Sequence, residues 1–203
     1  MGGTSKTYLA LGDSYTIGES VSEQERFPFQ TAQLLKDKNI DINIPDIIAK
    51  TGWTTRDLLD ALNSDPPQKT YSFVTLLIGV NNQYQGKSLQ EYKIQFAELL
   101  NKAVSYAGNN KNNVFVLSIP DYSVTPFANG YDTSAIANEI DAFNAANKSI
   151  SVNAGVHYVD ITPISRHAKN DLFLIAGDGL HPSQVQYEGW SKLLAEMMLQ
   201  EIL

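Results

Sequence analysis

The chain has 203 residues, of which 43% are hydrophobic and 18% charged, and it carries a formal net charge of −7. This composition is typical of a globular protein with a sizeable core, and the simplest organisation is one domain over residues 1–203. The negative charge argues against nucleic acid or an anionic membrane as the main partner. Because the chain has no cysteine, disulfides, thiolate metal sites and a cysteine nucleophile are excluded.

No segment has the apolar length of a membrane span, so we expect no integral membrane association. The first residues, MGGTSKTYLA, contain no apolar signal core. A leader removed before this sequence begins would leave the same pattern. The sequence therefore leaves open a cytoplasmic or an exported protein, and it sets no oligomeric state.

Short apolar runs rich in β-forming residues alternate with longer stretches of helical periodicity. The run FVTLLIG is apolar on both faces, which is typical of a central parallel strand covered by helices. This alternation predicts a parallel sheet with helices on both faces, in which ligands bind at the carboxyl ends of the strands. We expect strands at residues 7–11, 46–49, 73–78, 114–119 and 157–161.

Several helix starts carry capping patterns. Ser88 precedes a helical apolar stripe and forms a capping-box pattern with the glutamate three residues later, and Ser183 forms the same pattern with a glutamine. Thr133 is expected to cap another helix, and Thr54 or Thr55 the helix after the second strand. The apolar stripes of these helices indicate core packing.

Ser14 directly follows the first predicted strand, in the stretch LALGDSYTIG. A serine after a Gly-Asp turn is most often only a turn or cap residue. At the carboxyl end of a parallel strand, however, its hydroxyl would be held toward a ligand and could act as a nucleophile. Gly12 is expected to permit the turn that exposes it.

His181 is the histidine best placed to act as a base. Pro182 disfavours helical geometry at His181 and places it on an extended loop before the last helix. Asp178 stands three residues earlier, across a glycine, so its carboxylate can reach one ring nitrogen of His181. The other nitrogen is then free to take a proton from a serine hydroxyl, which is a weak nucleophile unaided.

Four other patterns are expected to have no catalytic role. His157 lies in a predicted strand, and His167 lies in the basic surface stretch RHAK. The sequon at Asn147 falls within a predicted helix. The stretch GVNNQYQGKS ends like a phosphate-binding loop, but six residues separate its glycines where that loop needs four.

Two further strand ends complete a larger pattern. Gly52 follows the second predicted strand, and Gly79-Val80-Asn81 follows the third. With Gly12-Asp13-Ser14-Tyr15 and Asp178-Gly-Leu-His181, these blocks resemble, in this order and across nearly the whole chain, the SGNH hydrolases, also called the GDSL esterase/lipase family. The GxSxG elbow of α/β-hydrolases is absent, because Thr16 occupies its last glycine position.

The resemblance implies a three-layer α/β/α sandwich with a mostly parallel five-stranded sheet, as in the flavodoxin-like fold of that family. It implies Ser14 as the nucleophile, His181 as the base and Asp178 as the residue that orients this base. The backbone N–H groups of Ser14 and Gly52 and the side-chain amide of Asn81 would form the oxyanion hole. Neither a metal nor a cofactor is expected.

The sequence departs from the family pattern at two positions. Tyr15 stands where the name-giving leucine of the family would be, and Asn82 stands where the third block often has aspartate. What that carboxylate does in relatives is therefore in doubt here.

The implied reaction is hydrolysis of a carboxylic ester, and a short acyl chain is preferred. Because the family includes lysophospholipases, thioesterases, arylesterases and carbohydrate acetylesterases, the partner is a small-molecule, lipid or carbohydrate ester. The loop at 120–133 carries Tyr122, Phe127 and Tyr131, and it is expected to wall the acyl pocket with Tyr84, unless it is an ordinary covering loop. The alternative function is a module of the same fold that binds an acylated or carbohydrate ligand without turnover.

Overall fold

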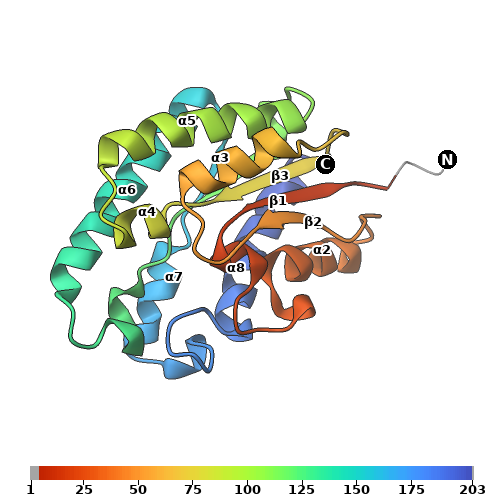
Figure 1. The fold of residues 1–203 in the computed structure, drawn as a ribbon. Coiled ribbons are helices and arrows are strands. Elements are labelled where there is room, and N and C mark those ends of the chain that lie inside the picture. Colours follow the sequence, from red (N-terminus) through yellow and green to blue (C-terminus); the bar gives the residue numbers. More distant parts are fainter. Residues whose placement is uncertain (1–4, 203) are drawn as a thin grey trace.

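The computed structural model describes residues 5–202. At its centre lies a five-stranded sheet with the strand order β2-β1-β3-β4-β5, in which every neighbouring pair is parallel. Helices lie on both sides of this sheet (Figure 1). The strands are β1 (Tyr8–Gly12), β2 (Asp46–Ala49), β3 (Phe73–Leu77), β4 (Val114–Leu117) and β5 (His157–Val159).

The helices form two layers. On one face, α2 (Phe27–Asp37) packs against α8 (Gln184–Gln200), while the other face is covered by α3 (Thr55–Ser64), α5 (Leu89–Tyr106) and α6 (Thr133–Ala154) (Figure 1). The predicted three-layer α/β/α arrangement is therefore confirmed. The short helices are α1 (Ser14–Ile17), α4 (Val80–Tyr84) and α7 (Thr162–Arg166).

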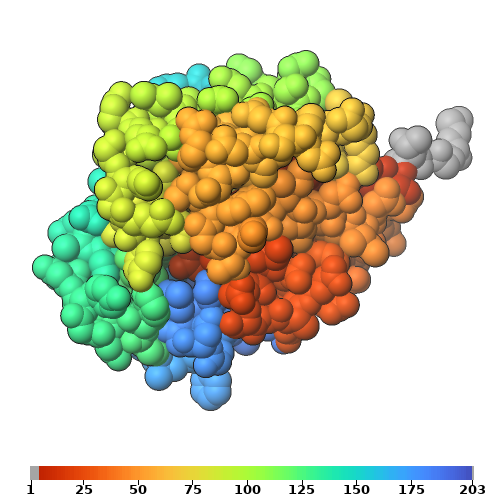
Figure 2. Space-filling model, viewed as in Figure 1, coloured from red at the N-terminus to blue at the C-terminus, as the bar shows by residue number. Residues whose placement is uncertain are grey.

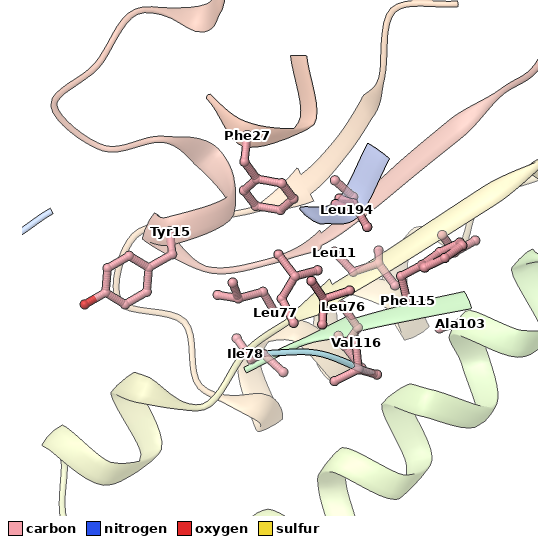
Figure 3. Close-up of a cluster of buried hydrophobic side chains, with 14 of the residues drawn as sticks. Leu11, Tyr15, Phe27, Leu76, Leu77, Ile78, Ala103, Phe115, Val116 and Leu194 are labelled. Carbon is pink, nitrogen blue, oxygen red and sulfur yellow. The ribbon is translucent and has the colours of Figure 1, made fainter. Parts of the chain in front are cut away.

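The core explains why the central strands are apolar on both faces. Every residue of β1 and β3 is buried, because helices cover both sides of the sheet. Figure 3 shows side chains from both helical layers meeting those of the strands. Its labelled members include Leu11, Leu76 and Phe115 from the strands, Phe27 and Leu194 from α2 and α8, and Ala103 from α5.

The predicted limits are confirmed for β2 and differ by one or two residues at the other four strands. β1 begins and ends one residue later than expected and so includes Gly12, while β4 and β5 each end two residues earlier. The strands stop where their parallel pairing stops, and an apolar run in the sequence does not mark that point.

The predicted helix caps are confirmed at three helices and wrong at one. Ser88, Ser183 and Thr54 cap α5, α8 and α3, each accepting a backbone N–H of the first turn. Asp132, and not Thr133, caps α6, because the Asp132 carboxylate accepts the N–H of the third helical residue.

In α5 and α8 the capping boxes predicted from the sequence are incomplete, because Glu91 and Gln186 do not accept the backbone N–H of the capping serine. The Glu91 carboxylate accepts a hydrogen bond from Gln95 one turn further along α5. The Gln186 amide donates to the carbonyl oxygen of Leu174, outside its own helix. Glu91 thus takes part in a contact between residues four apart on the same helix, and Gln186 in a contact with a segment outside its helix.

Among the helices of residues 5–202, none combines the length and the apolar character that crossing a bilayer requires.

Candidate active site

The predicted site lies where the strand order reverses. The chain leaves β1 and adds β2 on one side, then crosses to place β3 on the other side of β1. Ser14 follows β1 and Asn81 follows β3, so both lie at carboxyl ends of adjacent strands. Such a reversal leaves a crevice beyond the strand ends, where ligands bind in open α/β sheets.

Gly12 allows a close approach between α1 and β3. A Cβ atom at Gly12 would lie 2.1 Å from Thr16 Oγ1 and 2.4 Å from the carbonyl oxygen of Leu77. Gly12 is not among the glycines with a positive φ. The requirement for glycine is therefore steric, and the turn that the sequence suggested at this position is made by Asp13.

Asp13 directs the chain from β1 into α1. Its Oδ1 accepts the N–H of Tyr15 at 3.0 Å, which caps the helix. Asp13 is fully buried, and this burial raises the pKa of its carboxyl to about 7 against the effect of its backbone hydrogen bonds.

Ser14 is the first residue of α1 and only 5% exposed. None of the hydrogen bonds found among residues 5–202 uses its hydroxyl, and Ser14 borders a cavity. Residues in the first turn of a helix have backbone N–H groups without intrahelical partners. Ser14 thus brings both a hydroxyl and an N–H group to the cavity wall.

Asp178 and His181 form a compact turn before α8. The Asp178 Oδ1 atom accepts the backbone N–H groups of Leu180 at 2.9 Å and His181 at 3.0 Å, while Oδ2 lies 2.5 Å from His181 Nδ1. Gly179, with φ +75°, lets the chain close this turn. The predicted contact between Asp178 and His181 is present.

Hydrogen bonding dominates the electrostatics of Asp178. Burial alone would raise the pKa of Asp178, but hydrogen bonds from His181, from Ser20 and from the turn's backbone hold it well below its usual range. The Asp178 carboxylate is therefore ionised at neutral pH, and it is held against the Nδ1 atom of His181.

Two further groups face the same cavity. Asn81 Nδ2 donates one of its two N–H groups to the carbonyl oxygen of Trp53 at 2.9 Å. The second N–H of this amide takes no part in that bond. Gly52, with φ +84°, precedes Trp53, and a Cβ atom at Gly52 would meet nothing within 4 Å. Glycine is therefore favoured at position 52 by backbone conformation and not by lack of space.

These groups line one open cavity of about 160 Å³. It lies on the face of the molecule where the segments after β1 (red), after β2 (orange) and at α4 (yellow-green) meet the segment before α8 (blue) (Figure 2). The cavity is lined by Ser14, Tyr15, Thr51, Gly52, Val80, Asn81, Tyr84, Tyr122, Phe127, Leu180 and His181. Asp178 lies behind His181 and does not line it.

Three aromatic residues form the apolar wall of the cavity. The ring centroids of Tyr84, Tyr122 and Phe127 lie 6.0–6.3 Å from one another. The Phe127 N–H donates to the carbonyl oxygen of Gly179 at 3.0 Å, which attaches this wall to the turn that carries His181. Tyr131, also in the predicted loop, stacks on Phe127 but is not among the lining residues.

Sequence reasoning missed four lining residues, namely Tyr15, Thr51, Val80 and Leu180. Tyr15 is the largest omission: its buried ring lies edge-on to His181, with centroids 5.7 Å apart. The signal was present, since all four lie within or beside the quoted blocks.

The residues expected to be structural lie away from the cavity. His157 Nε2 lies 3.1 Å from Glu201 Oε1, and His167 is exposed at the start of a 3₁₀ turn. Asn147 is fully buried, and its amide bonds the hydroxyls of Tyr92 and Tyr158, so the sequon is inaccessible in the folded chain. Within residues 5–202, no three His, Asp or Glu side chains are grouped as a metal site would require.

The fold is shared with several solved structures. A lipase from a goat rumen metagenome superposes with a TM-score of 0.76 at 20% identity, over 95% of this chain and 97% of that one. An esterase from Pseudoalteromonas sp. superposes with a TM-score of 0.71 at 16% identity, over 97% of this chain and 98% of that one. An acetylxylan esterase from Geobacillus stearothermophilus superposes with a TM-score of 0.67 at 19% identity, over 98% of this chain and 95% of that one.

No curated protein sequence matches the chain significantly. The sequence model of a family described as GDSL-like lipase/acylhydrolase, however, matches residues 10–188. This range contains all four blocks, from the Gly12 block to the one that ends at His181. The chain therefore belongs to the GDSL-like lipase/acylhydrolase family.

Proposed function

We propose that this protein hydrolyses carboxylic esters through an acyl-serine intermediate, with Ser14, His181 and Asp178 as the catalytic triad. The observation that carries the proposal is the cavity itself. Ser14, Gly52, Asn81 and His181, which come from four separate segments of the chain, all line it, and His181 is bonded to Asp178 on its far side.

The first half-reaction begins at the Ser14 hydroxyl. His181 Nε2 removes the hydroxyl proton while Ser14 Oγ attacks the ester carbonyl carbon. Asp178 holds the proton of His181 on Nδ1, so that Nε2 is the atom free to accept. The contact between Ser14 and His181 is expected to tighten when substrate fills the cavity, as catalytic hydrogen bonds often do.

The negative charge that develops on the carbonyl oxygen needs donors that are already in place. Asn81 can supply its second amide N–H, because its first is fixed by the Trp53 carbonyl oxygen. The backbone N–H groups of Ser14 and Gly52 complete the oxyanion hole. Preorganised donors of this kind act mainly in the transition state.

Collapse of the intermediate breaks the bond between the acyl carbon and the alcohol oxygen. The alcohol leaves with the proton that His181 took from Ser14. A water molecule then attacks the acyl-serine, with His181 as its general base. This step releases the carboxylic acid and restores the free Ser14 hydroxyl.

The cavity supports a preference for short acyl chains. Its volume of about 160 Å³ is close to the ~150 Å³ of an apolar cavity that holds one benzene molecule, or about six carbon atoms. Tyr122 is buried and, with Tyr84 and Phe127, limits the apolar side. Acyl groups longer than about six carbons would therefore extend beyond these rings. Two of the structural neighbours are described as a lipase and an acetylxylan esterase, which act on esters of different kinds.

A fluorophosphonate probe tests the proposed nucleophile directly. The Pseudoalteromonas neighbour is described as inhibited by monoethylphosphonate, so a phosphonate is a suitable class of reagent. The folded protein should be labelled once, at Ser14, and Ser14→Ala should abolish both the label and ester hydrolysis. Ser64→Ala, at the exposed end of α3, is the matched control and should change neither.

A panel of nitrophenyl esters from acetate to palmitate tests the acyl preference. We expect kcat/KM to be highest at or below hexanoate and to fall for longer chains. Folded protein that neither takes up the probe nor turns over any ester would overturn the proposal, and ligand binding under those conditions would favour the binding-module alternative.

A further inference from the structure

A short segment after α1 is fixed to the backbone of Ser14. Gly18, in the left-handed conformation with φ +72°, and Glu19 both donate their N–H groups to the Ser14 carbonyl oxygen, at 3.0 and 3.1 Å. The side chains that follow therefore have a defined position relative to Ser14. None of the four sequence blocks includes this segment.

Ser20 connects this segment to Asp178. Its hydroxyl donates to Asp178 Oδ2 at 2.7 Å, the oxygen that also lies against His181 Nδ1. Ser20 has φ +66°, a left-handed conformation that is unfavourable for residues other than glycine. Asparagine adopts this conformation more readily than serine does, so at Ser20 the hydrogen bond to Asp178 offsets a backbone cost.

Glu19 connects the same segment to the other side of the cavity. Its carboxylate oxygen Oε2 accepts a hydrogen bond from the Thr51 hydroxyl. Thr51 lines the cavity directly before Gly52. No atom lies within 4 Å of the position that a Cβ atom at Gly52 would occupy, so side-chain packing does not support the loop on that side, and the hydrogen bond from Thr51 to Glu19 supports it instead.

We propose that Glu19 and Ser20 are positioning residues, which hold the Asp178–His181 turn and the Thr51–Gly52 loop in register with Ser14. Neither side chain lines the cavity, so each acts through another residue. Ser20 fixes the orientation of the Asp178 carboxylate, because its hydroxyl and His181 Nδ1 bond the same carboxylate oxygen. Glu19 fixes the position of the proposed Gly52 N–H donor through Thr51. This inference rests on the proposed esterase function.

The variant Ser20→Gly tests the first contact. Glycine adopts the left-handed conformation without strain, so the hydroxyl is lost while the fold is preserved. We expect kcat to fall about tenfold, as for loss of one hydrogen bond to a charged group, with KM nearly unchanged. The acidic limb of the kcat/KM profile should also move to higher pH, because Asp178 without the Ser20 proton offers more negative charge to protonated His181.

Asn39→Gly is the matched control for Ser20→Gly. Asn39 is also exposed, has φ +63° and lies in the turn after α2, away from the cavity. Its replacement should change neither kcat nor the pH profile. Thermal unfolding of both variants reports any change in folding.

Glu19→Ala and Glu19→Gln test the second contact. The alanine variant loses the acceptor for Thr51 and should lower kcat several-fold, whereas the glutamine variant keeps an amide oxygen as acceptor and should recover most of the loss. Recovery by glutamine distinguishes the hydrogen bond from the charge of Glu19.

The outcomes separate this inference from the proposed function. Wild-type protein with no label at Ser14 and no turnover would remove the esterase proposal itself. An active wild type whose Ser20→Gly variant keeps the same kcat and the same pH profile would overturn the positioning role. Equal activity losses in Glu19→Ala and Glu19→Gln would overturn the tether to Thr51.

Discussion

Asn82 is joined to Thr55 by both ends of its side-chain amide: Oδ1 accepts the Thr55 N–H at 3.0 Å, and Nδ2 donates to Thr55 Oγ1 at 2.7 Å. The Thr55 hydroxyl donates in turn to Gln95 Oε1 at 2.5 Å, and Gln95 Nε2 donates to Glu91 at 2.8 Å. All side-chain donors thus point toward the Glu91 carboxylate. An ionised aspartate at position 82 could not supply the first donor, which gives a physical reason for asparagine where the family often has aspartate.

The two adjacent asparagines should respond differently to substitution by alanine. Asn81→Ala removes a proposed oxyanion donor, so kcat should fall on the order of 10²–10³-fold with little change in KM. Steady-state kinetics, with circular dichroism to verify folding, measures this effect.

Asn82→Ala should instead lower stability. Asn82 is buried and does not line the cavity, and its loss leaves the Thr55 N–H without a partner. We expect the free energy of unfolding to fall by about 1–3 kcal/mol, with a smaller loss of kcat than in Asn81→Ala. Equal kcat losses in the two variants would mean that this block acts as a structural turn, and a larger loss in Asn82→Ala would reverse the assignment.

Asp178→Asn should abolish most activity while preserving the fold. Two backbone N–H groups, from Leu180 and His181, require an oxygen at the Oδ1 position. The asparagine amide nitrogen would then face His181 Nδ1 and donate to it, which forces the ring proton onto Nε2, where it blocks the base. We expect kcat to fall on the order of 10⁴-fold. Kinetics and thermal unfolding together check this, and activity within tenfold of the wild type would contradict the proposed role of Asp178.

Phe127→Ala should shift the acyl-length preference. Phe127 forms part of the aromatic wall and is not one of the proposed catalytic residues, so its truncation opens the cavity without removing a catalytic group. We expect kcat/KM for octanoate and longer esters to rise relative to acetate. Phe173→Ala is the control, since Phe173 is 86% exposed and does not line the cavity. An unchanged ratio would place the acyl chain elsewhere.

Asp13 should make stability depend on pH between about 4 and 7. In the unfolded chain an aspartate ionises near pH 3.9, whereas burial raises the pKa of Asp13 to about 7 in the folded protein. Within this window the folded state holds a proton that the unfolded state releases. The free energy of unfolding therefore decreases as pH rises, by at most about 4 kcal/mol across the window.

Asp13→Asn should flatten this dependence, because asparagine keeps the capping oxygen for the Tyr15 N–H and does not ionise. Urea unfolding at several pH values from 4.5 to 7.5 measures the slope. Asp178 acts in the opposite direction, but its lowered pKa places its contribution below the unfolded pKa and outside this window. Asp37→Asn, at the exposed end of α2, should keep the wild-type slope, and a slope unchanged by Asp13→Asn would contradict the assignment.

The layered fold and the position of the cavity could be predicted from local patterns. A run that is apolar on both faces, such as β3, indicates a parallel strand covered by helices on both sides. Because β1 and β3 are parallel, Ser14 and Asn81 lie at the same edge of the sheet. The contact between Asp178 and His181 was predictable for the same reason, since it spans three residues and depends on one glycine.

Contacts between distant segments were decided by the tertiary structure. Ser20 meets Asp178 across 158 positions, and Asn82 meets Thr55 across 27, so no periodicity or spacing in the sequence marks either pair. The sequence by itself determined which chemical groups stand at the strand ends, because strand and turn preferences act over a few residues. Which side chains orient those groups was decided only when the helices packed on the sheet, because packing fixes the direction of each donor and acceptor.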